Sequence, residues 1–188
     1  MVKSKLLSVK TQARLANVRA SFQHLLQASA FPGSDDLKYS MCALVDKGDK
    51  ETIAVIEQAI KNAEAQGVEK YGDKFAKAKK HNPLHDGDAE KEGQPGYENC
   101  IYFNCSNRQQ PRVLDALTGE VAQETDIYSG MYGTLIVNCY PYFNTAATCG
   151  VSISLMGFQK TADGEVLGGS RVSDSDFDDD DDGESFLD

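Results

Sequence analysis

The chain has 188 residues, with 19 Lys or Arg against 29 Asp or Glu, so its formal net charge is −10 at pH 7. The length and a hydrophobic fraction of 40% allow one domain with a buried core plus appendages. No segment approaches the roughly 18 apolar residues of a membrane span, and Leu6-Leu7 is too short for the hydrophobic region of a secretory signal. We therefore expect a cytoplasmic protein whose five cysteines are reduced thiols.

The first half of the chain predicts two strands followed by a helix. Residues 11–22 alternate imperfectly, which indicates a long strand with a bulge near Ala16, and residues 37–45 predict a second strand. Asp49 then has the character of a helix N-cap and Gly67 of a helix stop. Between them, apolar residues recur at helical spacing: Ile53, Ile56, Ile60 and Ala63. This amphipathic helix is expected to pack on a sheet.

The middle of the chain is basic and then rich in loop formers. Residues 68–80 predict a shorter helix that carries a cluster of lysines, countered only by Glu69 and Asp73: Lys70, Lys74, Lys77, Lys79 and Lys80. Surface lysines usually keep a protein soluble, and they less often contact a nucleic acid. Residues 82–97 contain Pro83, Gly87, Gly93, Pro95 and Gly96 and predict a loop.

The second half is rich in strands. Residues 98–106, 131–143 and 150–158 predict strands, with a hairpin turn at 144–149 between the last two. About five strands with one inserted helix are typical of a mainly β, five-stranded antiparallel Greek-key barrel of the OB-fold type. A β-sandwich is the alternative.

The strand at 131–143 has two faces of opposite character. Its odd positions are mostly aliphatic and are predicted to face the core, whereas its even positions include Tyr132, Tyr140 and Tyr142 among polar residues. Exposed aromatic rings can stack on bases of any sequence. The strand at 98–106 repeats the division, with Phe103 on one face and Tyr102 on the other. Tyrosines on a barrel strand are also often simple rim packing.

These tyrosines and nearby arginines form the predicted binding face. Residues 1–34 contain no acidic residue, so the first strand supplies unopposed positive charge. Basic side chains for phosphates and aromatic ones for bases are what nonspecific binding of single-stranded DNA requires. The predicted DNA-binding residues are Arg14, Arg19, Tyr102, Arg108, Arg112, Tyr132, Tyr140 and Tyr142.

The last fifteen residues, 174–188, contain nine acidic residues and no basic one. Without them, residues 1–173 carry 20 acids and 19 bases and are almost neutral. Repulsion between like charges and the small apolar content predict a solvated, disordered tail that works by contacting something else. The residues expected to engage a partner protein are Asp178, Asp179, Asp180, Asp181, Asp182, Phe186 and Leu187. We thus divide the chain into a binding domain, 1–173, and the acidic tail, 174–188.

Four segments in order carry a resemblance to a known family. They are KYSMCALVDKGDKETIAVIEQAI, NPLHDGD, YSGMYGTLIVNCYPY and GVSISLMGFQKTADGEVLGG, which fall between about Arg14 and Gly169. Together they resemble the phage single-stranded DNA-binding proteins, a family formerly described as a domain of unknown function. The layout is similar to that of the podophage replication proteins that coat single strands. The resemblance implies an OB-fold and single-stranded DNA as ligand, and it identifies no contact residue.

Enzymatic and metal-binding interpretations have little support. His81, His85, Cys100 and Cys105 could be drawn as a zinc site, but no CxxC pair occurs and Pro83 separates the histidines. Neither a GxSxG motif nor a phosphate-binding glycine loop is present. Asp86, Asp88 and Glu90 are more typical of a solvated acidic loop than of a metal site for nuclease chemistry. We expect no enzymatic activity, no cofactor and no bound metal.

The sequence therefore predicts a sequence-independent coat for single-stranded DNA in phage replication or recombination, acting in the host cytoplasm. The acidic tail would occupy the binding groove when DNA is absent and recruit replication or recombination proteins when DNA displaces it. It could do so in cis in a monomer or in trans in a homodimer. The alternatives are an acidic protein-binding module, such as a DNA mimic or a chaperone-like protein, and a phage structural β-barrel. A gel-shift comparison of single-stranded and duplex oligonucleotides separates the three.

Overall fold

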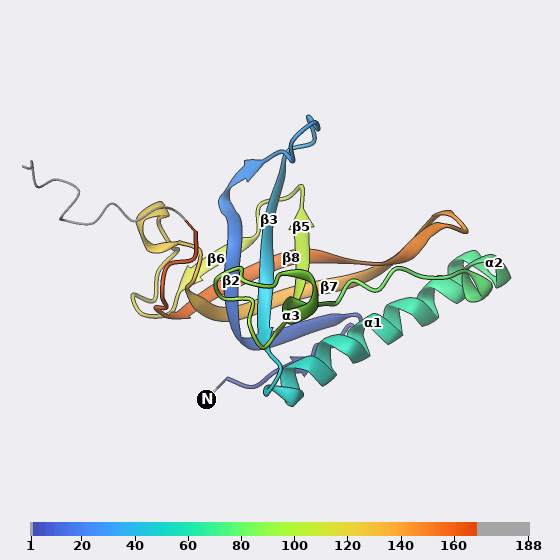
Figure 1. Cartoon of the computed structure of the whole chain (residues 1–188), viewed down its shortest axis with the longest axis horizontal. Coiled ribbons are helices and arrows are strands. Elements are labelled where there is room, and N and C mark those ends of the chain that lie inside the picture. The colour runs from blue at the N-terminus through green and yellow to red at the C-terminus, as the bar shows by residue number, and fades with distance from the viewer. Residues whose placement is uncertain (1, 169–188) are drawn as a thin grey trace, which may run out of the picture.

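The computed structural model describes residues 2–168, and the predicted acidic tail lies outside the described residues. Five long strands form a closed barrel (Figure 1). They are β2 (Gln12–Ser29), β3 (Lys38–Asp46), β5 (Cys100–Asn107), β7 (Tyr132–Thr145) and β8 (Thr148–Ala162). Neighbours pair antiparallel in the order β5-β3-β2-β7-β8, and a parallel pairing of Ser106 with Ser154 closes β8 onto β5. The predicted OB-type barrel is confirmed.

Short strands and several helical segments lie around this barrel. The minor strands are β1 (Lys5–Leu6) beside β2, β4 (His85–Asp86) beside β5, and β6 (Arg112–Asp115) beside β8. The helical elements are α1 (Lys50–Tyr71), α2 (Asp73–Lys77), α3 (Gly87–Glu90) and a 3-10 turn at Glu124–Asp126. The β7–β8 hairpin projects well beyond the barrel, and α1 runs alongside it (Figure 1).

The helix α1 begins where the sequence predicts. The side chain of Asp49 accepts a hydrogen bond of 3.0 Å from the backbone N–H of Thr52, which caps the first turn. The end of the helix was predicted wrongly, because α1 continues through Gly67 to Tyr71 and stops at Gly72. Gly72 has a φ of +67°, a conformation that glycine adopts without steric cost. The predicted second helix at 68–80 is accordingly reduced to α2.

Gly67 is a packing residue rather than a stop. It is buried in α1, and a Cβ at this position would meet the ring of Phe75. Gly→Ala in a helix interior normally stabilises by about 1 kcal/mol, but here we expect Gly67→Ala to lower the free energy of unfolding by about 1–3 kcal/mol through overpacking. Urea unfolding measures this change. In the background of Phe75→Leu, which makes room, the loss should shrink; an equal loss in both backgrounds would contradict the packing role.

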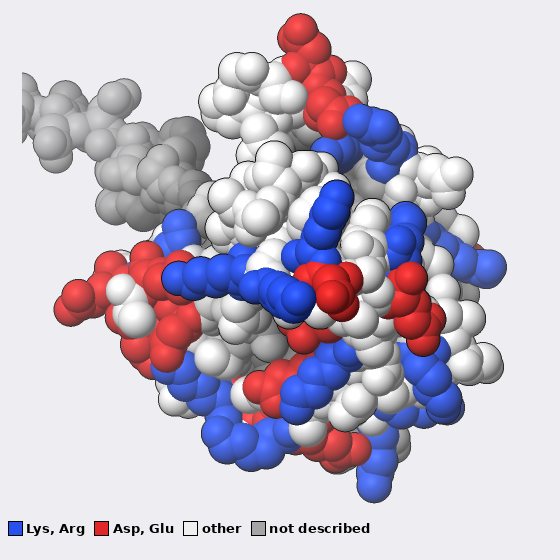
Figure 2. Space-filling view, turned by 90° about the vertical axis from the view of Figure 1, so that its right-hand side faces the viewer, with Lys and Arg blue, Asp and Glu red and all other residues white. Residues whose placement is uncertain are grey.

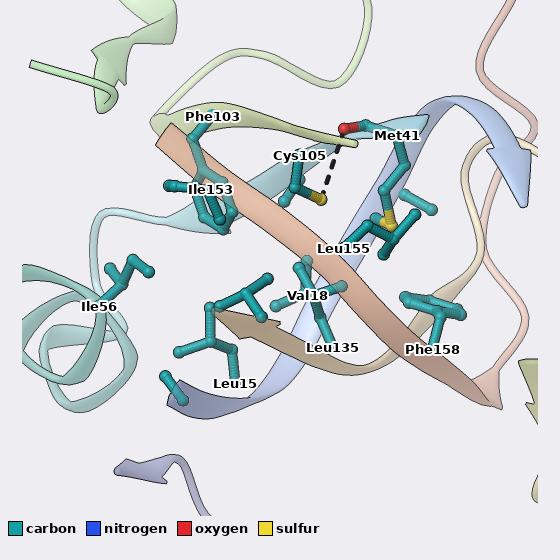
Figure 3. Packing of buried hydrophobic residues seen from close by; sticks show 14 of the residues in the cluster. Leu15, Val18, Met41, Ile56, Phe103, Cys105, Leu135, Ile153, Leu155 and Phe158 are labelled. Carbon is teal, nitrogen blue, oxygen red and sulfur yellow. Dashed lines mark hydrogen bonds between the residues drawn. The ribbon is translucent and has the colours of Figure 1, made fainter. Parts of the chain in front are cut away.

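The core fills the inside of the barrel with side chains from every long strand and from α1 (Figure 3). Leu15, Phe103, Leu135 and Leu155 are each less than 2% exposed. The odd positions of β7 point inward as predicted, down to Cys139. All five cysteines are free thiols, and burial raises the pKa of the Cys139 thiol to about 12, so it packs as a neutral side chain.

Three irregularities interrupt β2. The register shifts between Leu15 and Val18, which confirms the bulge predicted near Ala16, and it shifts again between Ser21 and His24 and between His24 and Ser29. Phe22, within the second irregularity, has a φ of +45°. Bulges commonly redirect a side chain, and this one places the ring of Phe22 on the outside of the barrel.

Candidate nucleic-acid interface

A groove of about 620 Å³ lies on the outer face of β2, β3 and β5, next to the loop that joins β2 to β3. In Figure 1 this is the upper part of the three upright strands, below the loop at the top. The groove is lined by Phe22, His24, Ser29, Ala30, Phe31, Pro32, Ser40, Met41, Cys42, Asn104, Cys105 and Ser106. We call it the Phe22–Phe31 groove. Its walls combine exposed aromatic rings with small polar side chains.

The two phenylalanines are exposed in a way that packing does not explain. Phe22 is 60% exposed and Phe31 is 65% exposed. A positive φ is strained for a bulky residue, so the backbone at Phe22 holds an apolar ring in solvent at an energetic cost. Strain of this kind is typically found at functional sites. The groove therefore presents aromatic faces to an external ligand.

Charged side chains stand at one end of the groove. Arg108 donates two hydrogen bonds to Asp36, of 3.0 and 3.1 Å, and Lys38 lies 3.0 Å from the same carboxylate. These bonds lower the pKa of Asp36 to about 2, so the carboxylate is ionised at neutral pH. Two cations contact one anion here, and the neighbouring exposed residue Asp35 adds a second anion, so the four charges beside the loop that carries Phe31 balance.

The lower part of the same strand face is covered by residues 82–97, which we call the covering segment. It lies in front of β3 and β5 and includes α3 (Figure 1). Lys47 fastens it through two contacts of 2.6 Å, to Asp86 and Asp88, and thereby lowers the pKa of both carboxyls. The predicted loop is therefore packed against the sheet.

Tyr97 anchors the other end of the covering segment. It is 1% exposed, and its hydroxyl lies 3.2 Å from Ser21 Oγ and 3.4 Å from Cys42 Sγ. Burial raises the pKa of Tyr97 well above its usual value, so the phenol is protonated at neutral pH. Its ring meets that of Tyr102 edge to face, with centroids 5.3 Å apart.

The predicted role of Tyr102 as an exposed stacking residue does not agree with the structure. Strand parity was right, since Phe103 faces the core and Tyr102 the outside. The covering segment nevertheless buries Tyr102, which is 6% exposed, stacks on His85 and donates a hydrogen bond of 3.2 Å to Glu90. Strand alternation alone does not reveal that a distant loop covers an outward face.

The other predicted tyrosines do not form one platform. Tyr132 and Tyr140 both point outward from β7, but eight residues of strand separate them by roughly 26 Å. Tyr140 is 44% exposed, whereas Tyr132 and Tyr142 are half-buried. The face predicted from parity exists, but it spreads over the length of the β7–β8 hairpin.

The predicted arginines are also dispersed. Arg14 donates to the carbonyl of Lys3, while Arg19 donates to the carbonyls of Gly130 and Glu165 and lies 5.5 Å from the ring centroid of Tyr132. Arg112 is exposed on β6, beside β8. Of the eight predicted residues, Arg108 is the one bonded into the loop that borders the Phe22–Phe31 groove.

Phe22, His24 and Phe31 were missed by sequence reasoning. The first strand was predicted to end at Phe22, whereas β2 continues to Ser29. One signal was available, because Phe31 directly precedes Pro32-Gly33, which marks a turn, and connecting segments run over the protein surface. The redirection of Phe22 by a bulge has no local sequence signature.

Among residues 2–168, no cluster of three or more His, Cys, Asp and Glu side chains is arranged to hold a metal ion. Within the same range, no helix has the length and apolarity needed to cross a membrane.

Comparison with known proteins gives a family and a fold. The family model described as "Enterobacter phage Enc34, ssDNA-binding protein" matches residues 11–187. The chain belongs to this family. Protein p50 of Acyrthosiphon pisum secondary endosymbiont phage 1 is 34% identical over 176 residues, which cover 88% of this chain and 92% of p50. The Enc34 family is one of binding proteins rather than enzymes.

Solved structures share the fold of this Enc34 family member. The single-stranded DNA-binding protein from bacteriophage Enc34, in complex with single-stranded DNA, has a TM-score of 0.73 at 22% identity, covering 89% of this chain and 96% of that one. The single-stranded DNA-binding protein gp2.5 of bacteriophage T7 has a TM-score of 0.57 at 14% identity, with coverages of 90% and 96%. At these identities the likeness establishes the OB-type barrel.

Proposed function

We propose that this protein binds single-stranded DNA without sequence preference and that the Phe22–Phe31 groove is its base-stacking site. The strained, exposed ring of Phe22 carries the proposal, because folding alone gives no reason to hold it there. An aromatic ring stacks on any base and contributes about 1–3 kcal/mol per base. Asn104 and Ser106 add hydrogen-bonding groups along the floor of the groove.

Phosphates are the ligands for the cations at the end of the groove. Lys38 and Arg108 already bind one carboxylate, Asp36, so an oxyanion is a matched partner for them. Of the predicted contacts, we therefore retain Arg108 for this groove and exclude the buried Tyr102.

Fluorescence anisotropy with a labelled oligo-dT and a duplex of equal length tests this function. The expected result is tighter binding of the single strand, with an affinity that falls as salt rises because bound phosphates release counterions. Equal affinity for the duplex, or no binding of oligo-dT, would overturn the proposal. Binding to basic proteins without DNA binding would instead favour an acidic protein-binding module.

The proposed biological role is to coat single strands in phage DNA replication or recombination in the host cytoplasm. The acidic tail, residues 174–188, would compete with DNA for the groove and its neighbouring basic side chains and recruit partner proteins when displaced. Its nine acidic residues support this, because the rest of the chain is almost neutral and its positive charge is concentrated locally.

Deleting residues 174–188 should tighten binding to oligo-dT at low salt by about tenfold or more, because a local polyanion competes at a high effective concentration. The difference should shrink as salt screens the tail. Anisotropy titrations between about 50 and 300 mM salt measure both effects. A tail with the same length but with Ser and Gly at the acidic positions is the control, and it should behave like the deletion. Unchanged affinity on deletion at low salt would rule out autoinhibition.

A further inference from the structure

We propose that the end of the molecule formed by the C-terminal part of α1, α2 and the β7–β8 hairpin is a second contact surface for single-stranded DNA. We call it the lysine surface and define it by Lys70, Lys74, Lys79 and Tyr140. This inference rests on the proposed function, since it extends the path of the same strand beyond the Phe22–Phe31 groove.

This end of the molecule is positively charged, and the ammonium groups of three of its five lysines form no ion pair or hydrogen bond within residues 2–168. Residues 68–81 contain five lysines and two acids, a net charge of +3 with His neutral. Lys77 pairs with Asp73 at 3.3 Å, and Lys80 lies 3.4 Å from the carbonyl oxygens of Ala76 and Ala78. The remaining three, Lys70, Lys74 and Lys79, are exposed and form no ion pair within residues 2–168.

The space-filling view faces this end of the molecule (Figure 2). Lys and Arg side chains project from the middle and lower parts of the face, with Asp and Glu side chains between them. Because the cations are long and extend outward, they can reach an external phosphate without first displacing a buried partner.

An exposed aromatic ring accompanies these lysines. Tyr140 is 44% exposed and lines a cavity of about 510 Å³ together with Gln66, Glu69, Lys70 and Pro141. A cation beside an accessible ring offers one phosphate contact and one stacking surface, the combination that single strands require. An acidic peptide would use the lysines but would leave the ring without a role, so the observations favour nucleic acid.

The polypeptide that leaves α2 connects the lysine surface to the strands of the groove. The chain leaving α2 runs along the edge of the hairpin, where His81 pairs with Gly150 of β8, and reaches β5, where His85 pairs with Tyr102. Asn104 in the groove lies two residues beyond Tyr102 on β5.

From Lys79 to His85, six residues of extended chain span at most about 21 Å, the step from His85 to its strand partner Tyr102 adds about 5 Å, and two residues of strand add about 7 Å. The lysine surface therefore begins at most roughly 33 Å from the groove. At the 3.4 Å spacing of nucleotides along one strand of B-form DNA, this distance corresponds to at most about ten nucleotides.

The test compares two variants of the full chain with equal charge change. One carries Lys70→Gln, Lys74→Gln and Lys79→Gln. The control carries Lys3→Gln, Lys5→Gln and Lys50→Gln, which are exposed positions near the first turn of α1, where Ser4 contacts Thr52. Affinities are measured by anisotropy for oligo-dT of increasing length, limited to lengths at which calorimetry gives one protein per oligonucleotide.

For an oligonucleotide that only fills the groove, both variants should match the wild type. For one about ten nucleotides longer, the lysine-surface variant should bind about tenfold more weakly than the control at low salt. Its slope of log affinity against log salt should be smaller by about 2, since each phosphate contact to a single strand contributes about 0.7. Tyr140→Ala should weaken binding of the longer oligonucleotide alone.

Two outcomes would overturn the proposal while leaving the groove function in place. One is equal binding by the two variants at every length, when the wild type binds oligo-dT. The other is that the lysine-surface variant no longer binds a synthetic peptide of residues 174–188 but binds long oligonucleotides as tightly as the wild type. That result would assign the surface to acidic peptides. Failure of the wild type to bind any oligo-dT would instead refute the proposed function.

Discussion

Replacing Phe22 and Phe31 together with alanine is expected to weaken binding of oligo-dT at least 30-fold and to leave the domain folded. Each ring contributes about 1–3 kcal/mol of stacking, so the pair accounts for about 2–6 kcal/mol. Both side chains are more than half exposed, and their removal therefore sacrifices little buried area. Anisotropy measures the affinity, and urea unfolding measures the stability.

A second substitution separates function from folding at the same position. Phe22→Gly should weaken DNA binding like alanine, but it should maintain or raise the free energy of unfolding, because a left-handed backbone costs a side-chain-bearing residue about 1–2 kcal/mol. Leu117→Ala is the control, since Leu117 is also 60% exposed and does not line the groove. If both phenylalanine variants bound like wild type, the Phe22–Phe31 groove would not be the stacking site.

Tyr97→Ala is expected to lower the free energy of unfolding by about 3–5 kcal/mol, the usual cost of truncating a buried aromatic residue. The free energy of unfolding of a small domain is about 5–15 kcal/mol in total, so this single substitution would remove a large fraction of it. The loss arises because Tyr97 fills the second hydrophobic cluster, where it packs with Cys42, Leu44, Tyr102 and Leu167. Urea unfolding gives the magnitude, and limited proteolysis shows whether residues 82–97 become the first site of cleavage.

The matched control for Tyr97 is Tyr140→Ala, which removes the same side chain from an exposed position and should change stability by less than about 0.5 kcal/mol. In the Tyr97→Ala protein, the lower part of the β2–β3–β5 face should become accessible, because the covering segment loses its anchor. A loss of less than 1 kcal/mol, with residues 82–97 still protected from protease, would mean that Lys47 and its two aspartates suffice to hold the segment.

The separation of inward from outward faces was readable from the sequence. Strand alternation is strictly periodic, so the inward set ending at Cys139 on β7 and the split between Phe103 and Tyr102 on β5 follow from spacing alone. The helix cap at Asp49 and the bulge near Ala16 could also be predicted, because each depends on neighbours within a few residues along the chain. These signals, together with the order of the strands and the helix, were enough to predict the OB-type barrel.

What lies over an outward face was decided only by the tertiary structure. Tyr102 and Phe22 both point out of the barrel, yet residues 82–97 bury the first and a bulge in β2 exposes the second. Covering and uncovering depend on contacts between segments far apart in the chain, such as Tyr97 with Ser21, and no local periodicity encodes them. The amino-acid pattern thus determined the barrel and its two faces, while long-range packing selected the part of the outer face that remains open to a ligand.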